Sequence, residues 1–151
     1  MSHIRIVVAD QAEAIFYDLS SLKARPAEIA RMSDPSAHLH DRDFSSDRPG
    51  RSYESFGKAR HAMESENDPR HRAAISFAKA IAGKLDLDRR NKEYEQLIVV
   101  AGAPFRSLMR AEFSTDTKAC VVHEVPKDLV HSPPEVLREH LPTTAQELKS
   151  A

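Results

Sequence analysis

Apolar residues follow two kinds of pattern along the chain, which predict strands and one long helix. Ile4–Ala9 and Gln96–Ala101 are apolar at almost every position, as is typical of strands buried on both faces of a sheet. Between residues 74 and 85, apolar side chains recur at spacings of three and four, which defines one face of an amphipathic helix. Asp68, followed by proline, predicts the start of this helix, because Asp is a common N-cap and Pro is tolerated in the first turn.

Weaker patterns complete the order of elements. Residues 20–33 fit either a ragged edge strand or a short helix. Residues 45–67 are polar, charged and poor in apolar anchors, which indicates a long exposed loop. The other predicted elements are strands at Glu13–Leu19, 36–44 and 118–125, a short helix after Pro104, and a helix that begins at a capping box formed by Ser132 and Glu135.

This order of elements predicts an α/β fold. Three strands come first and alternating helices and strands follow, in the order β-β-β-α-β-α-β-α. The continuous apolar strands need cover on both faces, so we expect three layers, with a mixed sheet of ribonuclease-H-like topology between helices. Right-handed crossovers place the strands at 96–101 and 118–125 parallel to the first strand. We expect one domain over residues 1–142 and a polar, loosely held C-terminal tail at 143–151.

Composition narrows the class of protein. The 151 residues carry 22 Lys and Arg against 23 Asp and Glu, a net charge of −1. This balance excludes a strongly basic nucleic-acid binder but allows a local basic patch. The single cysteine, Cys120, excludes an intrachain disulfide, and its apolar neighbours predict a small buried residue in the strand at 118–125. There is no apolar run of about 18 residues and no signal-peptide pattern, so we expect a cytoplasmic protein with no membrane contact.

No complete catalytic or metal-binding set of residues is evident in the sequence. Asp10 follows the first strand, where a two-metal nuclease needs a carboxylate, but the strand at 96–101 is not followed by a second one. Asp10 is more simply a turn residue. His38 and His40 share a strand face but lack a third ligand at a spacing that suits zinc. We therefore expect no catalytic residue, no metal and no cofactor, with a hydrolase or metal-dependent nuclease as an alternative.

Basic residues gather in the predicted loop and at the start of the helix that follows it. Arg48 and Arg51 flank a Pro-Gly turn, and arginines beside a helix N-terminus can bind phosphates. Residues 38–72 hold seven Lys and Arg against seven Asp and Glu, so a solvated loop whose charges pair internally is the alternative interpretation. The candidate nucleic-acid-binding residues are Arg48, Arg51, Lys58, Arg60, His61 and Arg70.

Several short motifs, in a fixed order, resemble one bacterial family. They are His40-Asp41-Arg42-Asp43, Ser46-Asp47-Arg48-Pro49-Gly50-Arg51, His61-Ala62-Met63-Glu64, Asp68-Pro69-Arg70, Phe77-Ala78-Lys79, Leu97-Ile98-Val99-Val100-Ala101, Pro104, and Val125-Pro126-Lys127-Asp128-Leu129 with His131. Together they resemble the family described as proteins required for attachment to host cells, over roughly residues 3–142.

The resemblance carries its own expectations about fold and activity. That family is similar to the middle domain of archaeal and eukaryotic class-1 peptide release factors, which implies a ribonuclease-H-like fold. In release factors the loop before the first long helix carries Gly-Gly-Gln. Here the corresponding loop reads Arg48-Pro49-Gly50-Arg51-Ser52, which departs from that motif at the residues that hydrolyse peptidyl-tRNA.

These observations favour a non-catalytic binding protein that contacts ribosomal or other RNA through its arginine-rich loop. A protein-interaction module that supports attachment, with a partner protein at an exposed sheet edge, is the alternative hypothesis. The sequence does not define the oligomeric state.

Overall fold

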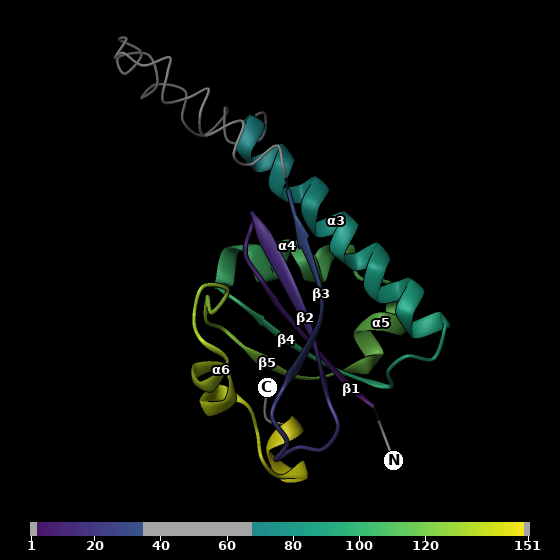
Figure 1. Ribbon diagram of the computed structural model, residues 1–151. Coiled ribbons are helices and arrows are strands. Elements are labelled where there is room, and N and C mark those ends of the chain that lie inside the picture. The colour runs from purple at the N-terminus through teal and green to yellow at the C-terminus, as the bar shows by residue number, and fades with distance from the viewer. Residues whose placement is uncertain (1–2, 35–67, 150–151) are drawn as a thin grey trace.

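A five-stranded mixed sheet forms the centre of the molecule (Figure 1). The computed structural model describes residues 3–34 and 68–149. The strand order is β3-β2-β1-β4-β5, with β2 antiparallel to both β1 and β3, and with β4 and β5 parallel to β1. This is the ribonuclease-H-like order that the sequence predicts. The strands are β1 (Ile4–Ala9), β2 (Glu13–Leu19), β3 (Ala27–Ser33), β4 (Gln96–Ala101) and β5 (Val121–Val125).

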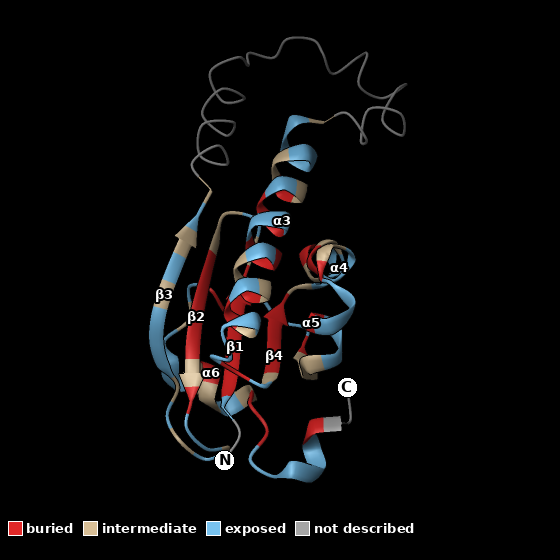
Figure 2. Cartoon of the chain, turned by 90° about the vertical axis from the view of Figure 1, so that its right-hand side faces the viewer, coloured by how far each residue is buried: buried red, intermediate tan, exposed pale blue. Residues whose placement is uncertain are grey.

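Helices cover both faces of the sheet and make three layers. Figure 2 shows α3 crossing one face, with α4 and α5 beside it, and α6 behind the sheet. Successive residues of β1 point to opposite faces of the sheet, and both faces are covered, which explains its continuous apolar sequence. Val7 packs under α3, whereas Ile6 and Val8 pack towards α6. The helices are α3 (Pro69–Arg90), α4 (Ala103–Glu112), α5 (Thr115–Cys120) and α6 (Pro134–His140), followed by a 3-10 helix, η2 (Ala145–Lys149).

The long helix α3 begins where the sequence predicts. The Asp68 carboxylate is its N-cap and accepts a hydrogen bond from the Arg70 N–H at 3.0 Å. The helix continues beyond the apolar pattern to Arg90, because Asp88 in its last turns is buried against a charged residue of β1. After the C-cap, Lys92 adopts a left-handed φ of 63°, a conformation in which glycine is preferred.

The charged partner of Asp88 is a buried arginine in the middle of the sheet. Arg5 is 1% exposed. Its Nη1 lies 2.7 Å from the Asp88 carboxylate and its Nε lies 2.8 Å from that of Asp18, while Nη2 lies 3.3 Å from Glu93. The guanidinium also lies 5.4 Å from the ring centroid of Tyr94. This cluster joins β1, β2 and the end of α3 through interactions between residues that are far apart in sequence.

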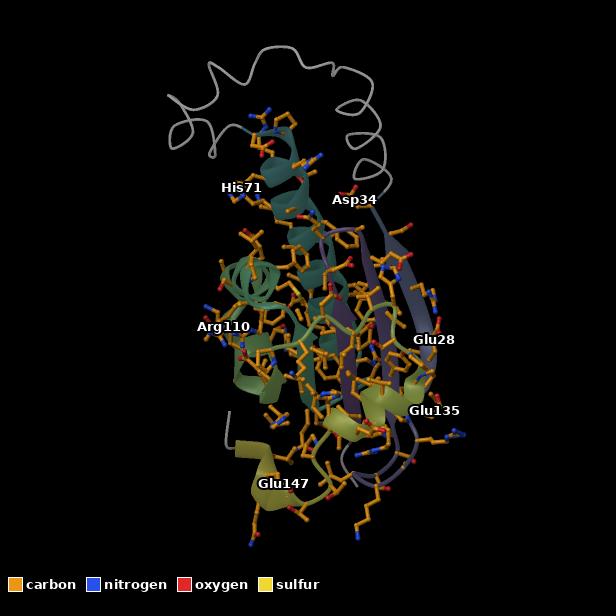
Figure 3. The ribbon with its side chains drawn as sticks, turned by 90° about the vertical axis from the view of Figure 1, so that its left-hand side faces the viewer. Glu28, Asp34, His71, Arg110, Glu135 and Glu147 are labelled. Carbon is orange, nitrogen blue, oxygen red and sulfur yellow. The ribbon has the colours of Figure 1, made fainter. Side chains whose placement is uncertain are left out.

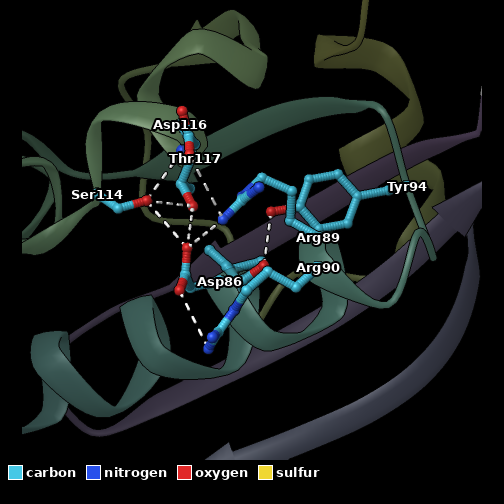
Figure 4. Close-up of polar contacts among 8 residues, drawn as sticks. Asp86, Arg89, Arg90, Tyr94, Ser114, Asp116 and Thr117 are labelled. Atoms are coloured by element: carbon cyan, nitrogen blue, oxygen red, sulfur yellow. Dashed lines mark hydrogen bonds and ion pairs between the residues drawn. The ribbon is translucent and has the colours of Figure 1, made fainter.

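The strand predicted at 118–125 is wrong in its first part, which is helix α5. Ser114 is the N-cap of α5 and accepts a hydrogen bond from the Thr117 N–H at 3.1 Å. The Asp86 carboxylate of α3 also accepts bonds from both hydroxyls and lies 2.8 Å from Arg89 (Figure 4). These local bonds favour a helical turn over extension of β5. Cys120 therefore ends a helix and is partly exposed, not buried in a strand.

Three further predictions differ from the structure or lie outside its described residues. The third strand of the sheet is β3, in the region with ambiguous pattern, and the strand predicted at 36–44 lies outside the described residues. Pro133, not Ser132, is the N-cap of α6, and no side chain caps it. The predicted C-terminal tail contains η2, whose Leu148 is 7% exposed, a packing that its polar composition does not indicate.

Candidate functional site

An open cleft of about 600 Å³ lies at the carboxyl ends of β1 and β4, beside the first turn of α3. In open α/β sheets, ligands bind in the crevice outside the carboxyl ends of the strands. Asp10 follows β1 and Gly102 follows β4, and both line the cleft. The topology therefore creates an open cleft where the sequence only indicates turns.

The floor of the cleft is apolar and its rim is charged. Phe105 and Leu108 of α4 form part of the floor with Ala74 of α3, and the Phe77 and Phe105 rings, 6.2 Å apart between centroids, hold the two helices together. The residues of the polar rim are Asp10, Gln11, Asp68, Arg70, His71 and Asp128. The rim thus brings together three segments that are distant in sequence.

The Asp10 carboxylate stabilises the β1–β2 turn. Its Oδ1 accepts hydrogen bonds from the backbone N–H groups of Ala12 and Glu13, both at 2.8 Å. Its Oδ2 lies 3.9 Å from Nε2 of His131. The two backbone bonds confirm the turn interpretation of Asp10.

A second carboxylate, Asp128, reaches the same cleft from the segment after β5. A Cβ added at Gly102 would lie 3.9 Å from the Asp128 Cβ, so the segments after β4 and β5 are close neighbours here. The sequence around Asp128 does not by itself indicate this position, because the contact between these segments depends on the parallel pairing of β4 and β5. In residues 3–34 and 68–149, no group of three or more His, Cys, Asp or Glu side chains is placed to hold a metal ion.

The first turn of α3 is basic and projects beyond the ends of β1 and β4 (Figures 1 and 3). Arg70, His71 and Arg72 are exposed there, and the first turn contains no acidic residue. The N-terminus of a helix carries a partial positive charge, so each cation placed there costs about 0.3–1 kcal/mol of helix stability. Arg89 and Arg90 lie in the last turn of α3, where positive charges stabilise the helix. Helix stability therefore does not account for the basic residues of the first turn.

Only one of the predicted nucleic-acid-binding residues lies in the described part of the chain. Arg70 is exposed on the rim of the cleft. The structure adds two basic neighbours, His71 and Arg72, which follow Arg70 directly and could have been selected by the same reasoning. The candidates Arg48, Arg51, Lys58, Arg60 and His61 lie outside the described residues, as do His38 and His40.

The fold and the cleft define an α/β protein with an open cleft at the carboxyl end of a mixed sheet. Residues 5–141 match the family described as "Protein required for attachment to host cells". The match covers most of the sequence, so the chain belongs to this family. No curated protein matches it. Among the helices of the described segments, none has both the length and the apolar composition that crossing a bilayer requires.

Proposed function

We propose that this chain is a non-catalytic, cytoplasmic RNA-binding protein of the host-attachment family. The observation that carries the proposal is the basic first turn of α3, which holds Arg70, His71 and Arg72 and contains no acidic residue. Phosphate groups favour this position because the arginine side chains and the partial positive charge of the helix N-terminus both attract anions.

The acidic residues of the cleft restrict how RNA can lie on this surface. Asp10 and Asp128 lie on the rim of the cleft and repel phosphates, so the sugar–phosphate backbone crosses the outer side of the first turn of α3 instead of entering the cleft. We propose that the RNA is also contacted by residues that precede this turn in the sequence, namely Arg48, Arg51, Lys58, Arg60 and His61.

The proposed class of RNA rests on a proposed relationship to release factors. We propose that the domain is related to their middle domain and that ribosomal RNA is its first candidate ligand. The sheet order β3-β2-β1-β4-β5 is compatible with that relationship. The loop sequence Arg48-Pro49-Gly50-Arg51-Ser52 lacks Gly-Gly-Gln, which supports binding without hydrolysis of peptidyl-tRNA. Attachment to host cells is then affected indirectly, through gene expression.

A binding assay with exposed-residue variants tests the proposal. The probe is a short fluorescein-labelled single-stranded RNA, and anisotropy reports binding to the parent chain and to an Arg70→Ala/Arg72→Ala variant. Two surface phosphate contacts are lost, so we expect binding to weaken about tenfold. Arg25→Ala is the matched control, because Arg25 is exposed and lies before β3, at the opposite end of the sheet. Equal RNA affinity in the parent and in the double variant would overturn the site assignment.

A second assay tests the class of RNA. Co-sedimentation with purified ribosomes at low and at high salt is expected to show salt-sensitive migration with the ribosomes. A chain that binds the short RNA but stays in the free fraction under both conditions binds another RNA, and the proposed ribosomal ligand is then wrong.

A further inference from the structure

The sheet ends at β5, whose outer edge faces an open groove. β5 pairs with β4 on one side, and in the described residues no strand pairs with its other side. A groove of about 710 Å³ is lined by Val121, Val122, His123 and Glu124 in succession. Neighbouring residues of a strand point to opposite faces, so a hollow that touches four in a row lies along the strand edge.

The walls of this groove come from three helical segments. Arg106 and Arg110 of α4, Lys118 of α5 and Leu148 of η2 line it. A smaller hollow of about 150 Å³ shares these three basic residues and reaches the apolar side chain of Phe113. The groove therefore offers apolar surface, a strand edge and a row of cations together.

The charges of the groove favour an anionic ligand. Three cations face one carboxylate, that of Glu124. Glu124 is 16% exposed and pairs with both arginines, with Arg106 Nη1 at 3.1 Å. This pairing holds the pKa of Arg110 above its usual value through a hydrogen bond and charge attraction. Because one carboxylate cannot neutralise three cations, the groove keeps an excess of positive charge.

Two buried polar atoms beside the groove also lack partners. Nε of Arg106 and Nδ1 of His123 are buried and make no hydrogen bond within the described residues. A buried polar group without a partner is costly, and native structures contain few of them.

We infer that the β5 edge binds an extended acidic segment of a partner protein, which adds a strand to the sheet. The partner's backbone pairs with β5, its alternate apolar side chains contact the groove floor, and its carboxylates meet Arg110 and Lys118. A second copy of this chain fits poorly, because pairing two β5 edges would bring two sets of three cations together. The strand edge and the apolar lining favour a peptide over RNA.

Fluorescence anisotropy with a labelled peptide of alternating Glu and Val tests the inference. We expect the parent to bind this peptide and an Arg110→Gln/Lys118→Gln variant to bind it about tenfold more weakly, because two charge contacts are lost. Both side chains are exposed, and Lys118→Gln alone leaves the Arg110–Glu124 pair in place if the double variant is unstable. Lys79→Gln, on an exposed position of α3, is the matched control and should bind as the parent does.

Peptide variants separate strand pairing from simple charge attraction. A Glu-Val peptide with alternate backbone N-methyl groups keeps its charge but cannot pair with a strand edge, so it should not bind. A Lys-Val peptide should not bind either. The inference is overturned if the parent does not bind the Glu-Val peptide or if N-methylation does not change binding. It is also overturned if the Arg110→Gln/Lys118→Gln variant loses affinity for single-stranded RNA instead of for the peptide. The RNA proposal rests on Arg70 and Arg72, so each proposal can fail without the other.

Discussion

Replacement of Arg5 by methionine tests the energetics of the buried ion cluster. Arg5→Met keeps an unbranched apolar stem but removes the guanidinium, whose Nη1 lies 2.7 Å from the Asp88 carboxylate. Asp88 is 5% exposed, so its carboxylate cannot be rehydrated without local opening. Removing one partner of a buried pair costs about 3–5 kcal/mol because the other charge stays uncompensated.

The remaining contacts of Asp88 set the expected value within this range. Lys84 lies 3.3 Å from the Asp88 carboxylate and is 30% exposed, so it compensates part of the lost charge. We therefore expect Arg5→Met to lower the free energy of unfolding by about 3 kcal/mol, the lower end of the range for a broken buried pair. For a domain of this size, that corresponds to a fall of about 6–12 °C in Tm.

Urea unfolding of the parent and of the variants in a double-mutant cycle tests this expectation. The variants are Arg5→Met, Asp88→Leu and the double variant, and the free energy of unfolding is measured for each. An apolar pair often replaces a buried ion pair without loss of stability, so the double variant should recover most of what Arg5→Met loses. The reasoning is refuted if Arg5→Met costs less than about 1 kcal/mol, within the range of a surface ion pair, or if the double variant is no more stable than Arg5→Met.

Four further outcomes are expected. Burial raises the pKa of Tyr94 from 10.0 to about 12. The neutral phenol therefore stabilises the fold below pH 10, and this contribution is lost as the pH rises towards 12. Tyr94→Phe should flatten the alkaline limb of a stability–pH profile. The hydrogen bond from Arg89 holds the pKa of Asp86 below its usual 3.8. The ionised Asp86 therefore stabilises the fold above pH 3.8, and this contribution is lost as the pH falls below 3.8. Asp86→Asn should remove this acid dependence from thermal unfolding. Lys92→Gly should stabilise the chain by about 1 kcal/mol in urea, because glycine adopts a positive φ without strain. Asp10→Ala should cost about 1 kcal/mol of stability through the turn, and RNA affinity by anisotropy should not fall, because the carboxylate that is lost repels phosphates.

Strong local patterns predict the elements that form the centre of the fold. β1, β2, β4 and the start of α3 agree with their predicted positions, because each combines a clear hydrophobic period with a turn or cap signal. β3 is an edge strand with mostly exposed residues, of which only Ala30 and Met32 pack against the core. A strand that buries so little has no distinct pattern, which explains why residues 20–33 are ambiguous.

Contacts between residues far apart in the chain could not be predicted from the sequence. The partners of Arg5 lie at residues 18, 88 and 93, and their convergence depends on how α3 crosses the sheet. The approach of Asp128 to Gly102 depends in the same way on the pairing of β4 and β5. By contrast, the basic residues at the start of α3 are contiguous, and the sequence indicates them directly.

The salt dependence of RNA binding tests the central claim most directly. The affinity of the parent chain and of the Arg70→Ala/Arg72→Ala variant for the labelled RNA is measured between about 50 mM and 200 mM salt. For the parent, the logarithm of the binding constant should fall linearly with the logarithm of salt concentration. Each lost phosphate contact reduces this slope by about 0.7 on single-stranded RNA, so the variant's slope should be smaller by about 1.4. No RNA binding by the parent at low salt, or the same slope for both chains, would contradict the account.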